Sequence, residues 1–338
     1  MSSVVENFTS FLWTDRYSEN GEFELYLPPS IDAPSQYGLD WYLVSPESEH
    51  AMIIESVLLE ADDNGYSYKV SGRSLESILS RRIPWGEVTL SGNFQTEIKR
   101  LITENIISPS DSSRRIDNFV FVDSSDPEIT KLTIDAKYSP DNNVYDIIQT
   151  NCQDFQIGFK VVLTSDNKFA FSLYKGTDRS YSQTILPYVI FSPDFDNLTN
   201  SSFLKSNKDL KNVALVGGDG DWPDKTTAVV GNATGLDRRE IYVDGPSSSE
   251  GEVTTAQLQK KGQEELADYK SSDAFEGEAN AYSMFVYGVD FFIGDTVQLE
   301  DAFGNAGRGV VSEMVFSIDE EGEKVYPTFV AAEEKEGE

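Results

Sequence analysis

The sequence is poor in cysteine, histidine and basic residues. Of its 338 residues, 27 are Lys or Arg and 58 are Asp or Glu, which sets the formal net charge at −31. Binding to nucleic-acid phosphates or to an anionic membrane surface requires clustered basic side chains. We therefore expect neither specific DNA binding nor stable membrane association. The single thiol, Cys152, also excludes an intrachain disulfide and any metal site built from several thiolates.

Long hydrophobic runs are missing as well. A helix that spans a bilayer takes roughly 18–20 apolar residues, whereas the longest runs here, such as 51–59, have the length of a strand. The N-terminal residues lack the basic and apolar regions of a signal peptide. The sequence thus predicts a protein that folds in a reducing cytoplasm. Hydrophobic residues still make up 39% of the chain and aromatic residues 12%, which is enough to build the cores of about two domains.

Short strand-like runs, separated by Gly, Pro, Asn and Asp, dominate the two ends of the chain. Residues 22–27 alternate between apolar and polar and stop at two prolines, as a half-exposed strand does. The runs 51–59 and 66–70 are joined by Asp-Asp-Asn-Gly, a strong hairpin signal. The segment 57–65 aligns without gaps on 314–322, because each has an apolar strand, an acidic turn and a glycine. Either two unrelated hairpins share turn chemistry, or a β-barrel is duplicated at the two ends of the chain.

The middle of the chain is more helical. Apolar residues recur on one stripe over 94–107 and again over 144–155, which predicts two amphipathic helices. A hairpin over 158–173 follows, so this region should form a small α+β domain. Cys152 lies on the apolar stripe of the second helix, which indicates a buried structural thiol rather than a nucleophile. Farther on, a polar helix with an apolar edge is predicted over 254–269.

The sequence shows no catalytic device. Hydrolases built on Ser-His-Asp or Cys-His need a histidine. The only one, His50, stands in a polar turn before a strand, where we expect a surface residue. Two carboxylates could catalyse glycoside hydrolysis, but among 58 acidic residues the closeness of two carries little information. We therefore predict no enzyme activity and no cofactor.

One acidic loop resembles part of a calcium site. Residues 217–224 read Gly-Gly-Asp-Gly-Asp-Trp-Pro-Asp, which makes Asp219, Asp221 and Asp224 candidate ligands. However, Trp222 stands where a calcium-binding nonapeptide repeat has Asp, and no Glu closes an EF-hand loop. An exposed acidic turn between two strands is the better interpretation, so we expect no metal site.

A series of short motifs runs through nearly the whole chain. In order, they are WTDRY at 13–17, GEFELYLPP at 21–29, AMIIE at 51–55, VSGRSLES at 70–77 with Arg81 and Arg82, FSLY at 171–174, GTDRS at 176–180, NVALVG at 212–217, GLDRRE at 235–240 and YGVDFFIGDTV at 287–297. Each motif alone is weakly specific. Together and in this order they resemble the siphophage tail-tip hub proteins, also called tail-associated or baseplate hub proteins, of the Gp37-like kind.

The resemblance implies a β-rich α+β fold in which two β-barrel domains flank a small α+β domain. The first barrel would take residues 1–93, the α+β domain 94–182, and the second barrel 183–331, interrupted by the helix at 254–269. An acidic tail would follow at 332–338. In related hubs three copies form a ring, and their six barrels approximate the six-fold symmetry of the tail tube.

The resemblance further implies a structural virion protein, assembled in the host bacterial cytoplasm. It would close the distal end of the tail tube and surround the channel used for genome ejection. Its partners would be copies of itself in a homotrimer, the distal tail ring protein, the tape measure protein and other tail-tip or fibre proteins, while DNA would pass without specific binding. Because the chain ends just past the second barrel, adhesion and wall digestion would belong to other proteins or to none. Two alternatives stay open: a virion-associated cell-wall or glycan hydrolase, and a carbohydrate-binding tail adhesin.

Charge bears on this role in two ways. Three chains of −31 total −93, and an acidic channel lining would keep passing DNA from sticking. The acidic residues could instead only solubilise the outside. In a chain so poor in base, six arginines are candidates for bidentate carboxylate pairs at barrel or subunit contacts, namely Arg16, Arg73, Arg81, Arg82, Arg238 and Arg239.

Overall fold

The computed structural model divides into two compact units. One unit comprises residues 1–201 and 276–338, and the other comprises residues 202–275. The residues that the structure describes are 4–5, 7–28, 37–62, 65–245, 253–267, 269, 272–279, 284–320 and 322–332. The three-domain division expected from the sequence stays a prediction.

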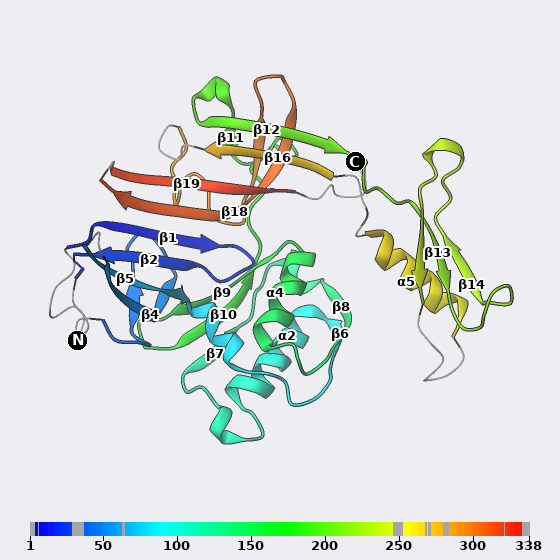
Figure 1. The fold of residues 1–338 in the computed structure, drawn as a ribbon, viewed down its shortest axis with the longest axis horizontal. Coiled ribbons are helices and arrows are strands. Elements are labelled where there is room, and N and C mark those ends of the chain that lie inside the picture. The colour runs from blue at the N-terminus through cyan, green and yellow to red at the C-terminus, as the bar shows by residue number, and fades with distance from the viewer. Residues whose placement is uncertain are drawn as a thin grey trace. The chain divides into compact units, whose positions relative to one another are not determined.

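A nine-stranded sheet joins the two ends of the chain within the first unit (Figure 1). Its strands follow the order β11-β17-β18-β1-β2-β5-β4-β3, and β19 pairs with β18. The central contact is antiparallel pairing of β1 with β18, from Phe11 opposite Ile318 to Arg16 opposite Glu313. The strands are β1 (Ser10–Arg16), β2 (Glu22–Leu27), β3 (Tyr42–Val44), β4 (Ala51–Asp62), β5 (Gly65–Ser74), β11 (Ile190–Phe191), β17 (Thr296–Glu300), β18 (Ala306–Asp319) and β19 (Gly322–Ala331).

This single sheet differs from the two separate barrels that the sequence led us to expect. Along the described residues, the hydrogen-bonded path runs from β3 to β11 without closing on itself. The regions expected to form the two barrels are instead continuous, because β1 hydrogen-bonds to β2 on one side and to β18 on the other. The predicted β-rich α+β class is confirmed, whereas no closed barrel occurs in the described part of the chain.

The two segments that align in the sequence occupy similar places in this sheet. Residues 57–62 are the end of β4 and Gly65 begins β5, whereas residues 314–319 are the end of β18 and Gly322 begins β19. The hairpin β4–β5 pairs with β2, and the hairpin β18–β19 pairs with β1. The predicted hairpins are therefore present on either side of the β1–β2 pair.

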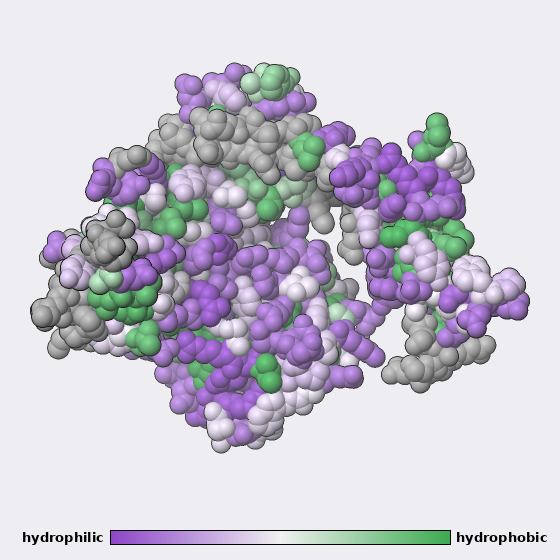
Figure 2. Space-filling view, in the orientation of Figure 1, coloured by the Kyte–Doolittle hydropathy of each residue, from purple (hydrophilic) through white to green (hydrophobic). Residues whose placement is uncertain are grey.

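The middle of the first unit is an α+β segment with its own core. It holds two small sheets, β7-β10-β9 and β6-β8, and the helices α2, α3 and α4. Figure 2 shows mostly hydrophilic residues on the visible face of the molecule over these helices. The elements are η1 (Leu75–Arg81), β6 (Val88–Asn93), α2 (Phe94–Ile102), η2 (Thr103–Ile107), η3 (Ser112–Arg114), β7 (Phe119–Val122), α3 (Pro127–Thr130), β8 (Thr133–Tyr138), α4 (Val144–Asp154), β9 (Gly158–Leu163) and β10 (Phe169–Tyr174).

Both predicted amphipathic helices form, and each begins at an asparagine. Asn93 caps α2 by accepting the N–H of Thr96, and Asn143 forms a capping box with Asp146 at the start of α4. The apolar stripe of each helix faces the core. Cys152 is fully buried there, as predicted. Burial raises the pKa of its thiol far above the ordinary value, which leaves the group unreactive.

The second unit is a three-stranded sheet covered by one helix. Its strands are β13 (Val213–Gly217), β14 (Thr227–Val230) and β15 (Glu240–Asp244), in the order β14-β13-β15, and η5 (Gly235–Asp237) precedes β15. The helix α5 (Thr255–Ala267) confirms the one predicted over 254–269 and buries Leu258 against Ala214 and Val216. Farther along the chain than β11, η4 (Pro193–Phe195) precedes β12 (Leu198–Ser206), which pairs with β16 (Ser272–Ala279). None of the helices in the described ranges is long and apolar enough to span a membrane.

Candidate functional site

A buried ion pair connects the nine-stranded sheet to the α+β segment. His50 immediately precedes β4, and its Nδ1 lies 3.1 Å from Oε1 of Glu76 in η1. The exposed fraction is 4% for His50 and 0% for Glu76. The same Glu76 oxygen also accepts the backbone N–H of Val161 in β9, at 2.7 Å. One carboxylate thus holds three elements together.

A second carboxylate, Asp15 in β1, extends this network. Trp13 Nε1 donates to one Asp15 oxygen at 2.8 Å, and Ser48 Oγ donates to the other at 2.6 Å. Ser48 Oγ in turn accepts the backbone N–H of His50 at 3.0 Å. The network therefore ties β1 to the turn that positions His50.

The pKa values in this network follow from burial and from the opposite charges. Burial alone would lower the pKa of His50, but the Glu76 carboxylate outweighs it and raises that pKa to about 9. Burial would likewise raise the pKa of Glu76, yet the charge of His50 holds it below the ordinary value. For Asp15, burial prevails and raises the pKa, although His50, Ser48 and Trp13 oppose it. The raised pKa favours the imidazolium form of His50 at neutral pH, in which Nδ1 donates its proton to Glu76.

The prediction of an exposed His50 was wrong. The polar residues before it indicate a turn, but the strand that it opens is buried on both faces from Ala51 to Ile54. A continuous apolar run directly after a histidine is the one signal that could have indicated its burial. Chemically, the pair lacks a nucleophile, because among the described contacts no Ser or Cys side chain hydrogen-bonds to the ring of His50.

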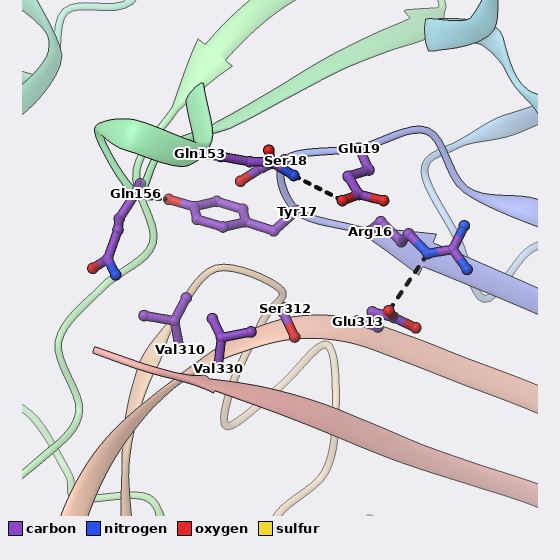
Figure 3. A pocket seen from close by; sticks show the side chains of 10 residues that line it. All are labelled: Arg16, Tyr17, Ser18, Glu19, Gln153, Gln156, Val310, Ser312, Glu313 and Val330. Carbon is purple, nitrogen blue, oxygen red and sulfur yellow. Dashed lines mark hydrogen bonds and ion pairs between the residues drawn. The ribbon is translucent and has the colours of Figure 1, made fainter. Parts of the chain in front are cut away.

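A cavity of about 280 Å³ lies where the β1–β2 connection, the end of α4 and the strands β18 and β19 meet (Figure 3). Gln153 Nε2 donates to Glu19 Oε1 at 2.7 Å across one side of it. On the other side, Arg16 lies between two carboxylates, 2.6 Å from Glu22 and 3.5 Å from Glu313. These pairs neutralise the guanidinium, and Val310 and Val330 give the cavity an apolar wall, so it is a gap between packed elements rather than a charged site.

Four of the six candidate arginines pair with carboxylates. Within the described residues, Arg73 forms the one bidentate pair of the six, with its Nε and Nη2 at 2.7 and 2.9 Å from the two oxygens of Glu55 on β4. Arg16 bridges β1 and β18 through Glu313. The other two pairs are Arg81 with Asp40 at 3.0 Å and Arg238 with Glu240 at 2.5 Å.

The remaining two arginines bind main-chain carbonyls instead. Arg82 donates from Nε to the carbonyl of Arg114 and from Nη1 to that of Arg81, both at 2.8 Å. Arg239 donates to the carbonyl of Asn207. The structure thus places all six side chains within the chain's own packing, and their role between subunits stays a prediction.

The calcium candidates do not come together as a site. Asp219, Asp221 and Asp224 lie in the connection between β13 and β14. Main-chain bonds close this turn, from Asp224 N to Asp221 O at 2.9 Å and from Thr226 N to Asp219 O at 3.0 Å. In the portion of the chain that the structure describes, no group of three or more His, Cys, Asp or Glu side chains could hold a metal ion. The loop is an acidic turn between two strands.

Comparisons with known proteins bear on the whole chain rather than on a single site. The profile of the family described as Siphovirus ReqiPepy6 Gp37-like protein matches residues 1–329. Comparison with curated proteins finds no match.

Among the solved structures that share the fold are three tail proteins. A tail protein from Neisseria meningitidis MC58 is 14% identical with a TM-score of 0.58, over 97% of this chain and 93% of that one. The 43 kDa tail protein of prophage MuSo2 from Shewanella oneidensis is 12% identical with a TM-score of 0.59, over 97% and 96%. Prophage tail protein gp18 from Listeria monocytogenes EGD-e is 13% identical with a TM-score of 0.54, over 98% and 92%. At such identities the comparison establishes the fold alone.

Proposed function

The chain belongs to the Siphovirus ReqiPepy6 Gp37-like protein family, and from this premise we propose that it is a structural protein of the phage tail, the hub of the tail tip. The observation that carries the proposal is the extent of the shared fold. This chain covers 93% and 96% of two solved tail proteins, so the likeness is to whole proteins rather than to one common domain. Its partners are then the distal tail ring protein, the tape measure protein and other tail-tip or fibre proteins, and its location is the virion.

The hub is a homotrimer in this proposal, with the regions 1–93 and 183–331 of each copy contributing two barrel-like parts to one ring. The open sheet supports it, because β3 and β11 are edges along the described path. Exposed apolar side chains lie beside both edges, Trp41 and Val44 at β3, Leu186 and Tyr188 before β11. An edge left bare in one chain is a natural place for another chain to dock. A contact between two different edges is heterologous, and such contacts form a ring when the rotation that relates the copies closes.

The ring surrounds the channel through which DNA leaves the virion. The net charge of −31 per chain supports this part, since a negative lining repels phosphate and lets DNA pass without binding. A hub of this kind requires no catalysis. The buried pair of His50 and Glu76 contacts the backbone N–H of Val161, as a structural pair does, and is not arranged as a nucleophile and its base.

The mass of the purified protein in solution tests the proposal. Light scattering behind a sizing column is expected to give three times the chain mass of 37.7 kDa. A mass of one chain that persists after the distal tail ring protein is added would contradict the trimer. Zymography on cell walls tests the hydrolase alternative, and we expect no lysis.

A further inference from the structure

The sheet of the second unit has one covered face and one open face. Successive residues of a strand point to opposite faces of its sheet. The core of this unit lies between the sheet and α5 and consists of Ala214, Val216, Ala228, Val243 and Leu258. The residues between these positions therefore belong to the other face. On that face Val229 is 54% exposed and Tyr242 is 45% exposed.

Three apolar side chains form the central row of the open face. Leu215 on β13 is paired with Val229 on β14 and with Tyr242 on β15. Gly217, two residues farther along β13, leaves room for the tyrosine, because a Cβ there would collide with the Tyr242 hydroxyl and with Cε of Lys225. The aromatic ring thus leans across β13 instead of standing away from the sheet, and the row forms a smooth apolar surface.

An apolar row is not what a water-facing sheet carries. An antiparallel sheet can leave one face to solvent, but that face then bears polar residues, whereas parallel sheets have both faces covered. The pair β13–β15 is parallel, and the row Val229–Leu215–Tyr242 is apolar in a chain in which 25% of the residues are charged. The open face therefore has the character of a surface that another element covers, and the hub role assigns nothing to it.

A single helix fits this face. The opposite face is covered by one helix, α5, of 13 residues. Three strands roughly 4.8 Å apart measure about 10 Å from the first to the third, which matches the diameter of one helix. A second copy of this chain does not supply such a helix. The helices of eight or more residues that the structure describes, α2, α4 and α5, all bury their apolar sides in their own cores.

Charge differs between the two ends of this face. Where β13 and β15 end, four carboxylates and one lysine give a net charge of −3, namely Asp219, Asp221, Asp224, Asp244 and Lys225. Where the same strands begin, three bases and two acids give a net charge of +1, namely Lys211, Arg238, Arg239, Asp237 and Glu240. A helix with basic side chains at one end is complementary to this distribution when that end lies over the acidic turn at 219–224.

We propose that the open face of the second unit binds an amphipathic α-helix that carries Lys or Arg at one end and belongs to a different protein. The apolar stripe of the helix packs on the row Val229–Leu215–Tyr242, and its basic end lies over the acidic turn at 219–224. The apolar contacts supply affinity, and the charges fix the direction of the helix. This surface belongs to the second unit, whereas β3 and β11 belong to the first. The proposal therefore depends on neither the trimer nor the hub role.

Fluorescence anisotropy of the full chain with three labelled synthetic peptides tests the proposal at physiological ionic strength. The first peptide is a helix with a leucine stripe, Lys at one end and Glu at the other. The second has the same residues in an order without a stripe, and the third has the stripe with Glu at both ends. We expect the first peptide to bind about tenfold more tightly than either of the others, because it alone matches both the row and the acidic turn.

Substitutions on the open face locate the binding. Val229→Asp and Tyr242→Ala should each weaken the first peptide by about tenfold, because each removes part of the apolar row. Val122→Asp and Tyr66→Ala are the matched controls, since Val122 and Tyr66 are also exposed strand residues but lie in the first unit. Thermal unfolding of every variant serves as the folding check. If Val229→Asp is unfolded, Val229→Thr, which keeps the shape but adds a hydroxyl, should still weaken binding.

Each other outcome would overturn the proposal. Equal binding of the first and second peptides would indicate only general attraction of Lys to an acidic chain, and equal binding of the first and third would remove the role of the acidic turn. Absence of binding by the first peptide, or equal losses in test and control variants, would exclude the site. A mass by light scattering that falls in Val229→Asp but not in Val122→Asp, without any peptide, would show that a second copy covers this face instead.

Discussion

His50 and Glu76 form a buried pair, with Nδ1 of the imidazolium 3.1 Å from Oε1 of the carboxylate. The two residues are 26 positions apart in the sequence and belong to different layers, one opening β4 and the other lying in η1. Because Glu76 also accepts the N–H of Val161, the pair fixes the sheet to the α+β segment. A rigid joint at this place suits a protein whose proposed role is to keep a ring in shape.

Removing one charge of this pair should be costly. We expect Glu76→Gln to lower the free energy of unfolding by about 3–5 kcal/mol, since it leaves the imidazolium of His50 buried without a counter-charge. Urea denaturation at neutral pH measures the change. Glu47→Gln is the control, because Glu47 is exposed and its loss should be neutral. Equal free energies of unfolding in both variants would show that the pair of His50 and Glu76 does not stabilise the fold.

The same pair should make stability depend on pH. The pKa of His50 is raised to about 9, so its contribution is complete below the ordinary value of 6.5 and is lost as the pH rises toward 9. The pKa of Glu76 is lowered, so its contribution is complete above 4.5 and is lost as the pH falls through the lowered value. Burial raises the pKa of Asp15, so ionisation of its carboxyl group as the pH rises lowers the stability of the folded state as well.

The expected profile is a maximum between about pH 5 and 6.5 and a decline toward pH 9. Urea midpoints across this range measure it, with the His50→Leu/Glu76→Leu double variant as the control. That variant removes both charges, so the decline above pH 6.5 that comes from His50 should disappear. A wild-type midpoint that does not change between pH 6.5 and 9 would contradict the assignment.

Local periodicity predicted the local structure well. The stripes over 94–107 and 144–155 form α2 with η2 and α4, and Cys152 is buried where the stripe places it. The family resemblance is also confirmed, because its motifs, which run from 13 to 297, lie within the residues that the family profile covers, 1–329. These signals depend on neighbours in the sequence or on a fixed order of motifs, so one chain is enough to detect them.

What the sequence did not show depends on long-range contacts. The pairing of β1 with β18 joins residues about 300 positions apart, and alternation along a strand does not say which strand lies beside it. For the same reason His50 was misplaced, since its partner lies in another layer. The row Val229–Leu215–Tyr242 was missed as well, because it forms only when three strands pair.

Gly72 should tolerate no side chain. It lies in β5 opposite a bulge in β4, and a Cβ there would meet the carbonyl oxygen of Ile53 at 1.8 Å. We expect Gly72→Ala to lower the free energy of unfolding by roughly 3 kcal/mol, because two backbones must move apart. Gly307→Ala in β18 is the matched control, since nothing lies within 4 Å of its Cβ. Equal midpoints for the two variants in urea would refute this account of the bulge.

Two of the candidate arginines should behave differently when truncated. Arg82→Ala removes bonds to the carbonyls of Arg114 and Arg81, and we expect a loss of about 1–3 kcal/mol in the free energy of unfolding. Arg238→Ala removes an exposed pair with Glu240, and such pairs contribute about 0–1 kcal/mol.

Thermal unfolding and light scattering on both variants distinguish a loss of packing within the chain from a loss of assembly between chains. If Arg238 lies between subunits, its variant keeps the parent's unfolding temperature but loses the mass of the trimer. A variant that keeps both has no assembly role, and an Arg82→Ala protein as stable as the parent would show that its two carbonyl bonds contribute nothing.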